Sequence, residues 1–344
     1  MTTPRLTERR PELSPDEMVD AMAPPPRFDA VRFETYEPNP DEPSQAEAVA
    51  ACRAFAERIA QSSGKSGRGR LRSLFGRGGR SGDEQPGLYL DGGFGVGKTH
   101  LLASTWHAVP GPKSYGTFVE LTNLVGALGF SETVRRLSEH RLLAIDEFEL
   151  DDPGDTMLVT QLVGKLTDAG VRVAATSNTL PDKLGEGRFA AADFLREIHA
   201  MSSRFSVVRV DGPDYRHRGM PDAPDPMGDD ELTRAAAGTD GATLDDFDEL
   251  CDYLAGLHPS KYGRLVEDVS TVHLRGVRAA PDQDVGLRLV ALADRLYDRA
   301  VPVRASGQAL SAMFTEEMLA GGYRKKYLRA QSRLTALSRD LAKS

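Results

Sequence analysis

The sequence predicts an α/β fold: a five-stranded parallel sheet between helices, followed by a smaller, mainly helical C-terminal lid domain. Between residues 87 and 211, short apolar stretches alternate with stretches of helical periodicity. Each connection is long enough for a right-handed crossover between parallel strands. Beyond residue 246, most apolar residues recur at helical spacing. These observations together predict one layered α/β domain and one helical domain.

Residues 1–86 are predicted to form an N-terminal extension with one helix and a basic, glycine-rich loop. The helix is expected from Pro43 to Ile59, where the apolar residues lie on one face. The loop runs from Lys65 to Arg80 and contains no acidic residue. Its composition fits a solvated flexible loop, and it also fits an electrostatic contact with acidic protein, nucleic acid or lipid headgroups. The sequence leaves these two alternatives open.

Residues 87–219 are predicted to form the α/β core. Its strands are expected at 87–91, 114–121, 141–146, 171–178 and 204–211, and its helices at 98–107, 131–140, 154–170 and 190–203.

An acidic stretch rich in proline and glycine predicts a linker over 220–245. A helical lid domain over 246–344 is expected to follow, with one extended piece within 263–277.

Composition narrows the functional classes. The net charge of −8 argues against a general nucleic-acid coat. No apolar run approaches the roughly 20 residues that cross a bilayer, and the polar N-terminus lacks the apolar block of a secretory signal. Two distant cysteines, Cys52 and Cys251, predict neither a disulfide framework nor a zinc site. The expectation is a cytoplasmic protein whose membrane contact is at most peripheral.

A phosphate-binding loop is predicted between the first strand and the first core helix. The pattern G-x-x-x-x-G-K-[ST] is complete, and its strand–loop–helix setting separates it from a chance match. Glycines allow successive N–H groups to converge on phosphate oxygens at the positive end of the helix. Lys98 is expected to reach the β- and γ-phosphates of ATP, and the Thr99 hydroxyl to bind Mg²⁺. The predicted loop residues are Gly92, Gly93, Phe94, Gly95, Val96, Gly97, Lys98 and Thr99.

Polar residues at two further strand ends complete the predicted site. Asp146 and Glu147 follow an apolar strand, at the carboxyl edge where ligands bind in such sheets. We expect Asp146 to hold Mg²⁺ through water and Glu147 to accept a proton from the attacking water. Asn178 ends the strand that we expect between these two sites, where its amide could hold the water or touch the γ-phosphate.

The transition state also needs positive charge, which a neighbouring subunit often supplies. Arg188, Arg196 and Arg204 are candidates in the core, and Arg288, Arg329 and Arg333 could sense nucleotide from the C-terminal domain. The sequence does not rank them.

Several stretches resemble the AAA+ ATPases, and within them the AFG/ZapE family. "LFGR" before "GLYLDGGFGVGKT" and "AATSN" followed by "PDKL" are similar to that family's segments. "DEFELDDPGDTMLVTQL" and the Asp-Tyr-Arg of "VVRVDGPDYRHR" are the more family-specific matches. The histidine directly after Lys98-Thr99, His100, instead resembles the residue at this position in bacterial replication initiators and helicase loaders. We include His100 among the predicted nucleotide-binding residues. The resemblance covers roughly residues 30–340. It implies a homo-oligomer and a protein client, with bacterial members acting on the cell-division ring.

The leading interpretation is a Mg²⁺-dependent ATPase that drives conformational change on a protein partner. The alternative is a DNA-associated loader or initiator that uses ATP as a switch, suggested by "GKTHLL" and the basic C-terminal helix. Against it, no helix-turn-helix with a base-reading face is evident, so nucleic acid is not the expected partner. A third interpretation, a scaffold with a purely structural ATP site, conflicts with the intact Asp146-Glu147 pair.

Overall fold

The computed structural model describes residues 3–12, 14–62, 85–93, 95–149, 153–184, 195–213 and 224–339. The fold divides into two compact units. The core unit comprises Pro15–Pro24 and Phe28–Tyr215, and the C-terminal unit comprises Met1–Ser14, Pro25–Arg27 and Arg216–Ser344. Among the described residues, none of the helices combines the length and apolar character that a membrane span requires.

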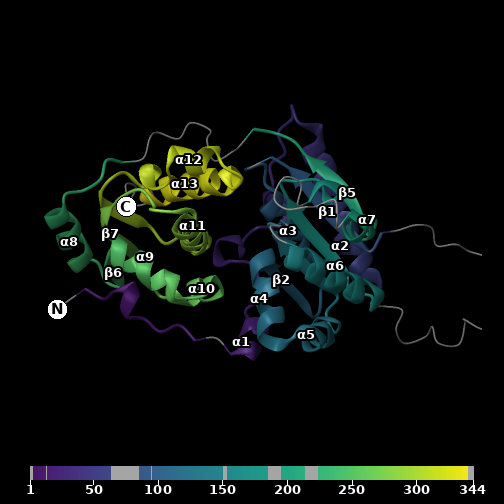
Figure 1. The fold of residues 1–344 in the computed structure, drawn as a ribbon. Helices are drawn as coiled ribbons and strands as arrows, with labels where there is room; N and C mark the ends of the chain where they lie inside the picture. Colours follow the sequence, from purple (N-terminus) through teal and green to yellow (C-terminus); the bar gives the residue numbers. More distant parts are fainter. Residues whose placement is uncertain are drawn as a thin grey trace, which may run out of the picture. The chain divides into compact units, whose positions relative to one another are not determined.

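The predicted five-stranded parallel sheet of the core unit is confirmed, with strand order β2-β3-β4-β1-β5. Figure 1 labels β1, β2 and β5 of this sheet. Its strands are β1 (Gly87–Gly92), β2 (Lys113–Thr117), β3 (Leu142–Asp146), β4 (Arg172–Ser177) and β5 (Phe205–Val210). Its helices are α1 (Pro15–Asp20), α2 (Pro43–Ser62), α3 (Lys98–Ala108), α4 (Phe118–Leu128), α5 (Phe130–Leu137), α6 (Pro153–Asp168) and α7 (Leu195–Ser202).

Both faces of this sheet are buried at its central strands β1, β3 and β4, as their apolar character predicts. On one face, Leu143 and Ile145 belong to a hydrophobic cluster that includes residues of α4 and α6. On the other face, Leu142 and Ala144 belong to a second cluster that includes residues of α2 and α3. Because alternate residues of β3 enter opposite clusters, the strand is fixed between two layers of helices.

The second strand is shorter than predicted. It ends at Thr117, and α4 begins at the next residue, within the stretch 114–121 that was expected to be one strand. The Thr117 hydroxyl accepts the N–H of Glu120, and the Glu120 carboxylate accepts the N–H of Thr117 at 2.7 Å. This reciprocal capping box starts a helix despite the β-branched and aromatic residues around it.

The C-terminal unit contains helices, as predicted, and also a three-stranded parallel sheet of order β6-β7-β8. Its strands are β6 (Ala242–Asp246), β7 (Thr271–Val277) and β8 (Val303–Gly307). Its helices are α8 (Asp229–Ala237), α9 (Phe247–Ala255), α10 (Tyr262–Leu265), α11 (Gln283–Asp298), α12 (Glu316–Ala320) and α13 (Arg324–Arg339). The sequence predicted one extended piece here, which corresponds to β7. The stretch 220–245, expected as a linker, contains α8 and β6.

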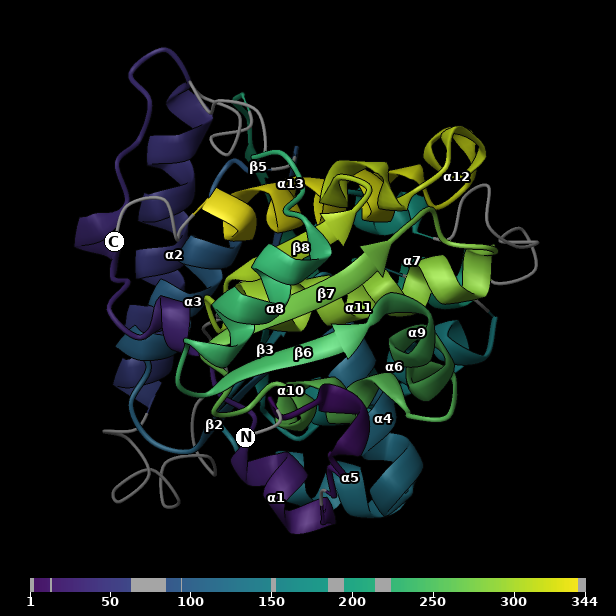
Figure 2. The ribbon, with the colours of Figure 1, turned by 90° about the vertical axis from the view of Figure 1, so that its left-hand side faces the viewer.

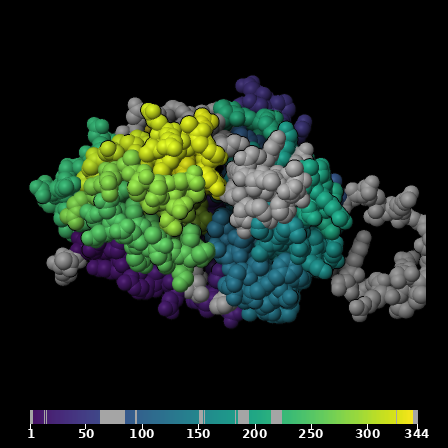
Figure 3. Space-filling view, in the orientation of Figure 1, coloured from purple at the N-terminus to yellow at the C-terminus, as the bar shows by residue number. Residues whose placement is uncertain are grey.

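The three strands lie side by side, and α8 crosses the sheet face nearest the viewer in Figure 2. Leu232 and Ala236 of α8 are buried. The core on the opposite face combines Val272, Leu274 and residues of α9, α11 and α13. Figure 3 presents one side of this unit as a continuous surface of green to yellow side chains.

A buried histidine makes the stability of the C-terminal unit dependent on pH. His273 is 1% exposed, and its Nδ1–H donates to the carbonyl of Thr243 at 3.1 Å. Nε2 has no hydrogen-bond partner among the described residues. Burial lowers the pKa of His273 below its usual 6.5 and outweighs the hydrogen bond to Thr243, which raises that pKa; the nearby Arg304 lowers it as well. The unfolded chain therefore binds this proton more readily than the folded chain does.

We expect the free energy of unfolding of this unit to fall as the pH drops below about 6.5, because the unfolded His273 then takes up its proton. His273→Asn keeps a donor near the Thr243 carbonyl but cannot titrate, so its stability profile should be flatter between pH 7 and pH 5. Chemical denaturation at several pH values measures this slope. His258→Asn, at an exposed position, is the matched control. Equal slopes for wild type and His273→Asn would contradict the prediction.

Candidate active site

The glycine-rich loop joins the central strand β1 to α3, whose first residue is Lys98. Gly95 and Gly97 have φ of 66° and 89°, a region that favours glycine. Packing also requires glycine, because a methyl group at Gly92 would lie 2.1 Å from the carbonyl oxygen of Val210. At Gly97 it would lie 2.5 Å from the ring of Tyr36. The loop is thus shaped by its own protein neighbours as well as by any anion that it receives.

Three predicted loop residues remain: Gly93, Phe94 and Val96. Val96 is buried, and its carbonyl accepts the Tyr36 hydroxyl at 2.8 Å. Gly93 follows β1 directly and would tolerate a methyl group, whose nearest neighbour would be 3.9 Å away. Phe94 lies outside the described residues.

Lys98 connects the loop to the tip of β4. Its ammonium donates to the carbonyls of Gly92, at 2.9 Å, and Gly93, and to the Asn178 amide oxygen at 2.9 Å. The side chain is 8% exposed. These three acceptors are neutral, and phosphate oxygens would bind the ammonium more strongly, since charge-assisted hydrogen bonds are the stronger ones. Lys98 and Asn178, predicted separately, are therefore brought together.

Asp146 ends β3 and is 6% exposed. Its Oδ1 accepts the Thr99 hydroxyl at 3.3 Å, the Thr176 hydroxyl, and the N–H of Glu147 at 3.1 Å. Its Oδ2 accepts the Tyr115 hydroxyl at 3.0 Å. The two predicted metal ligands, Thr99 and Asp146, thus face one another. Hydroxyl and carboxylate oxygens are hard donors, which suits Mg²⁺.

Glu147 has a left-handed backbone with φ of 54°, which is unfavourable for a residue with a side chain. Its N–H donates to Asp146 and to the Thr176 hydroxyl at 3.1 Å. Next to it, Phe148 is fully buried, and its ring makes edge contacts with Tyr89 and Phe118. These contacts hold Glu147 in a strained conformation, and strained residues of this kind cluster at functional sites.

His100, also predicted to bind nucleotide, is the third residue of α3 and contacts residues that precede α2. Its Nε2 lies 3.0 Å from the Thr35 hydroxyl and 3.1 Å from the carbonyl oxygen of Arg32, and its ring packs edge-on against Tyr36. Burial lowers the pKa of His100. The ring is engaged with the segment that precedes α2, so its contacts are with protein.

The predicted arginines occupy unrelated places. Arg204 immediately precedes β5, at the opposite end of that strand from Val210 and roughly 16 Å from the phosphate loop. Its guanidinium donates to Asp168 and Thr167 of α6, each at 2.7 Å. Arg196 is exposed on α7. Arg188 lies outside the described residues.

The arginines predicted to sense nucleotide lie on α11 and α13 of the C-terminal unit. Arg329 is 8% exposed and donates to the buried Asp294 at 2.7 Å, and Arg333 donates to the other oxygen of that carboxylate. Burial alone would raise the pKa of Asp294, but the two guanidinium groups outweigh it and hold the pKa at about 2. Arg329 and Arg333 are thus committed to joining α11 to α13. Arg288 is partly buried on α11.

Sequence reasoning missed Tyr36, Tyr115 and Thr176. Thr176 could have been predicted, because it lies two residues before Asn178 in the same predicted strand. Tyr115 enters the site from β2, whose position beside β3 follows only from the sheet order. Tyr36 comes from the segment before α2, and no local pattern marks its contact with the loop.

The chain matches the family described as AFG1-like ATPase over residues 24–237 and 228–343. Cell division protein ZapE of Escherichia coli K12 is 36% identical over 149 residues, 40% of this chain and 40% of that protein. Lactation elevated protein 1 homolog B of Danio rerio is 28% identical over 157 residues, 39% of this chain and 31% of that protein.

Among solved structures, domain III of the replication initiation protein DnaA from Thermotoga maritima is similar with a TM-score of 0.39 and 21% identity. The similarity covers 56% of this chain and 70% of the DnaA domain. The chain thus matches less than half the length of the curated relatives named above.

Proposed function

This chain belongs to the AFG1-like ATPase family, and we propose from that premise that it hydrolyses ATP with Mg²⁺ at the carboxyl edge of its five-stranded sheet. The observation that carries the proposal is the pair of contacts from the start of α3 to the strand tips, Lys98 to Asn178 and Thr99 to Asp146. A phosphate chain that binds at the loop would lie beside both of these side-chain pairs.

In this proposal each side chain has one task. Lys98 leaves its carbonyl acceptors and binds the β- and γ-phosphates, and Asn178 holds the attacking water or the γ-phosphate. Thr99 and Asp146 hold Mg²⁺, which when bound neutralises charge on the phosphates. Glu147 accepts the proton of the water that attacks the γ-phosphorus, and the bond to the bridging oxygen of ADP breaks.

A phosphate-release assay tests the activity. Purified protein is expected to release inorganic phosphate from ATP when Mg²⁺ is present and to stop when EDTA removes it. Arg172→Ala, a change at the opposite end of β4 from Asn178, is a suitable control and should retain activity. Phosphate release that continues in excess EDTA would contradict the assigned role of Mg²⁺. Absence of release under all nucleotide and metal conditions would contradict ATP hydrolysis itself.

We further propose that the protein works as a homo-oligomer on a protein client. Support comes from family membership, and the relative named as a cell division protein suggests the division machinery as one source of clients. Arg196, exposed on α7, is available to approach the nucleotide of a neighbouring copy. Capture experiments with Glu147→Gln, loaded with ATP, should retain a client that Lys98→Ala does not retain. Equal recovery of proteins with both variants would count against a nucleotide-dependent client.

A further inference from the structure

We propose that residues 15–22, here called the docking segment, form a positioning element for the ATP site and act through Tyr115 on the carboxylate of Asp146. The inference rests on the proposed Mg²⁺-ATP chemistry and adds a regulatory input to it. The chain on both sides of this segment, Met1–Ser14 and Pro25–Arg27, belongs to the C-terminal unit. The docking segment is thus covalently tied at both ends to residues of the other unit.

The first contact is with the edge of the sheet. β2 is an edge strand, and the N–H of Tyr115 donates to the carbonyl of Met22 at 2.9 Å. Met22 is 7% exposed and belongs to the hydrophobic cluster that contains Phe118 and Leu121 of α4. A methyl group at Gly116 would lie 3.4 Å from Met22 Cε, so the Met22 side chain lies directly beside this residue of β2. The docking segment therefore holds the backbone of Tyr115 directly.

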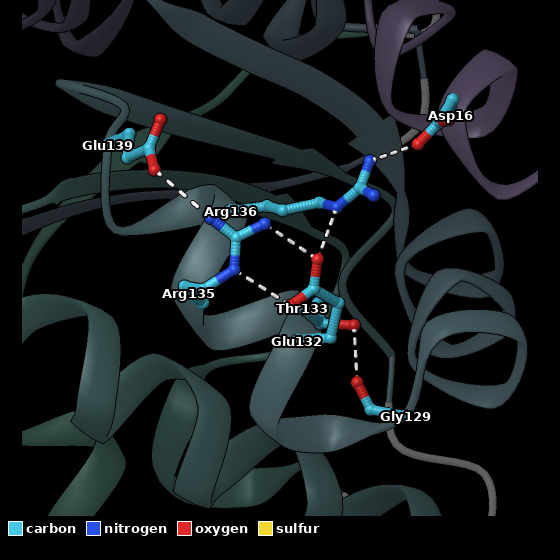
Figure 4. A network of polar contacts seen from close by, with 7 residues as sticks. All are labelled: Asp16, Gly129, Glu132, Thr133, Arg135, Arg136 and Glu139. Atoms are coloured by element: carbon cyan, nitrogen blue, oxygen red, sulfur yellow. Dashed lines mark hydrogen bonds and ion pairs between the residues drawn. The ribbon is translucent and has the colours of Figure 1, made fainter.

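The second contact aligns α1 with α5. The Arg136 guanidinium binds Asp16 of α1 and Glu132 of its own helix, and Arg135 binds Glu132 and Glu139 (Figure 4). Hydrogen bonds from Arg135 and Arg136 lower the pKa of Glu132 to about 2, so Glu132 remains ionised at neutral pH. These solvent-exposed ion pairs contribute little to the free energy of docking, but they define the position of Asp16 of α1 beside Arg136 of α5.

The third contact reaches the site. Tyr115 is 2% exposed, and its hydroxyl donates to Asp146 Oδ2 at 3.0 Å. Thr99, Thr176 and the N–H of Glu147 donate to the other oxygen, Oδ1. The Tyr115 hydroxyl thus helps to fix the orientation of the Asp146 carboxylate. That orientation determines where the carboxylate could accept a hydrogen bond from a water bound to Mg²⁺. Groups that orient a ligand in this way usually affect metal affinity strongly.

These contacts form one chain from Met22 through Tyr115 to Asp146. α1 has six residues, too few to be stable as an isolated helix, so its structure depends on docking. When the docking segment leaves β2, Tyr115 loses the hydrogen bond that its N–H makes to the Met22 carbonyl, and the Asp146 carboxylate loses the orientation that Tyr115 supports. The site would then bind Mg²⁺-ATP less well while its phosphate loop remains intact.

The experiment measures binding of a fluorescent ATP analogue while Mg²⁺ is titrated, which needs no turnover. Tyr115→Phe removes only the hydroxyl, and the Mg²⁺ concentration for half-maximal enhancement should rise roughly tenfold. Binding in EDTA should stay within about twofold of wild type, because the loop is untouched. Tyr262→Phe, which removes a buried hydroxyl that donates to the Leu254 carbonyl in the C-terminal unit, is the matched control.

Met22→Ala tests the docking segment itself. Hydrogen exchange at the Tyr115 amide should become faster, and the Mg²⁺ requirement should rise in the same direction as in Tyr115→Phe. The double variant should need no more Mg²⁺ than Tyr115→Phe alone, because both changes act through one contact. An unchanged Mg²⁺ requirement in Tyr115→Phe, or in Met22→Ala with a faster Tyr115 amide, overturns the inference. Wild-type protein that binds no ATP analogue with or without Mg²⁺ overturns the proposed function itself, which is a distinguishable result.

Discussion

Lys98→Ala is expected to weaken ATP binding by about a hundredfold or more, because it removes the buried cation beside the phosphate loop. In the structure this ammonium satisfies the carbonyls of Gly92 and Gly93 and the amide of Asn178. ATP would replace these neutral acceptors by phosphate oxygens, and alanine can make neither set of contacts. Equilibrium binding of a fluorescent ATP analogue, with the melting temperature recorded in parallel, gives the result.

Two further variants make this result interpretable. Lys98→Met keeps most of the buried stem and loses the charge, so it should bind ATP as poorly as Lys98→Ala while packing better. Lys165→Ala removes an exposed lysine from α6 and should bind as the wild type does. Wild-type affinity in a folded Lys98→Met protein would show that the lysine does not contact the nucleotide.

Glu147→Gln is expected to retain ATP and to lose turnover by roughly a hundredfold to ten-thousandfold, the range attributed to a positioned general base. Glutamine has nearly the same volume and keeps the backbone N–H that donates to Asp146 and Thr176. The substitution therefore leaves the phosphate loop and the strand tips in place and removes only the proton acceptor. Single-turnover phosphate release measures the chemical step, and analogue binding measures retention.

The control for this loss is Glu57→Gln, which neutralises an exposed carboxylate on α2 and should leave turnover unchanged. Rapid phosphate release by a Glu147→Gln preparation free of other ATPases would exclude Glu147 as the base. Loss of both binding and turnover would instead assign the residue a structural role.

Much of the core unit was predictable because its central strands β1, β3 and β4 are buried, mostly apolar runs with glycine or a helix signal nearby. The phosphate loop and Asp146-Glu147 were predicted for the same reason, since each follows such a strand. The early start of α4 was missed, although Thr117 and Glu120 carry a capping box in the sequence. There, the aromatic and β-branched residues favoured a strand, and the local hydrogen bonds decided otherwise.

Contacts between distant segments could not be predicted in this way. Tyr115 reaches Asp146 only because β2 lies beside β3, and Arg329 meets Asp294 only because α13 packs against α11. Most of the sheet of the C-terminal unit was also not predicted, because its strands have weak local patterns. β6 and β8 have five residues each and contain polar positions such as Asp245 and Arg304, so neither gives a strong strand pattern.

The left-handed backbone of Glu147 has an energetic consequence. The edge contacts of Phe148 with Tyr89 and Phe118, and the hydrogen bond from the Glu147 N–H to the Thr176 hydroxyl, hold the unfavourable dihedral angles. The cost of that conformation is met during folding, by contacts within the protein. A carboxylate positioned in advance needs little reorganisation when a substrate arrives, and this is how a preorganised polar site lowers a barrier.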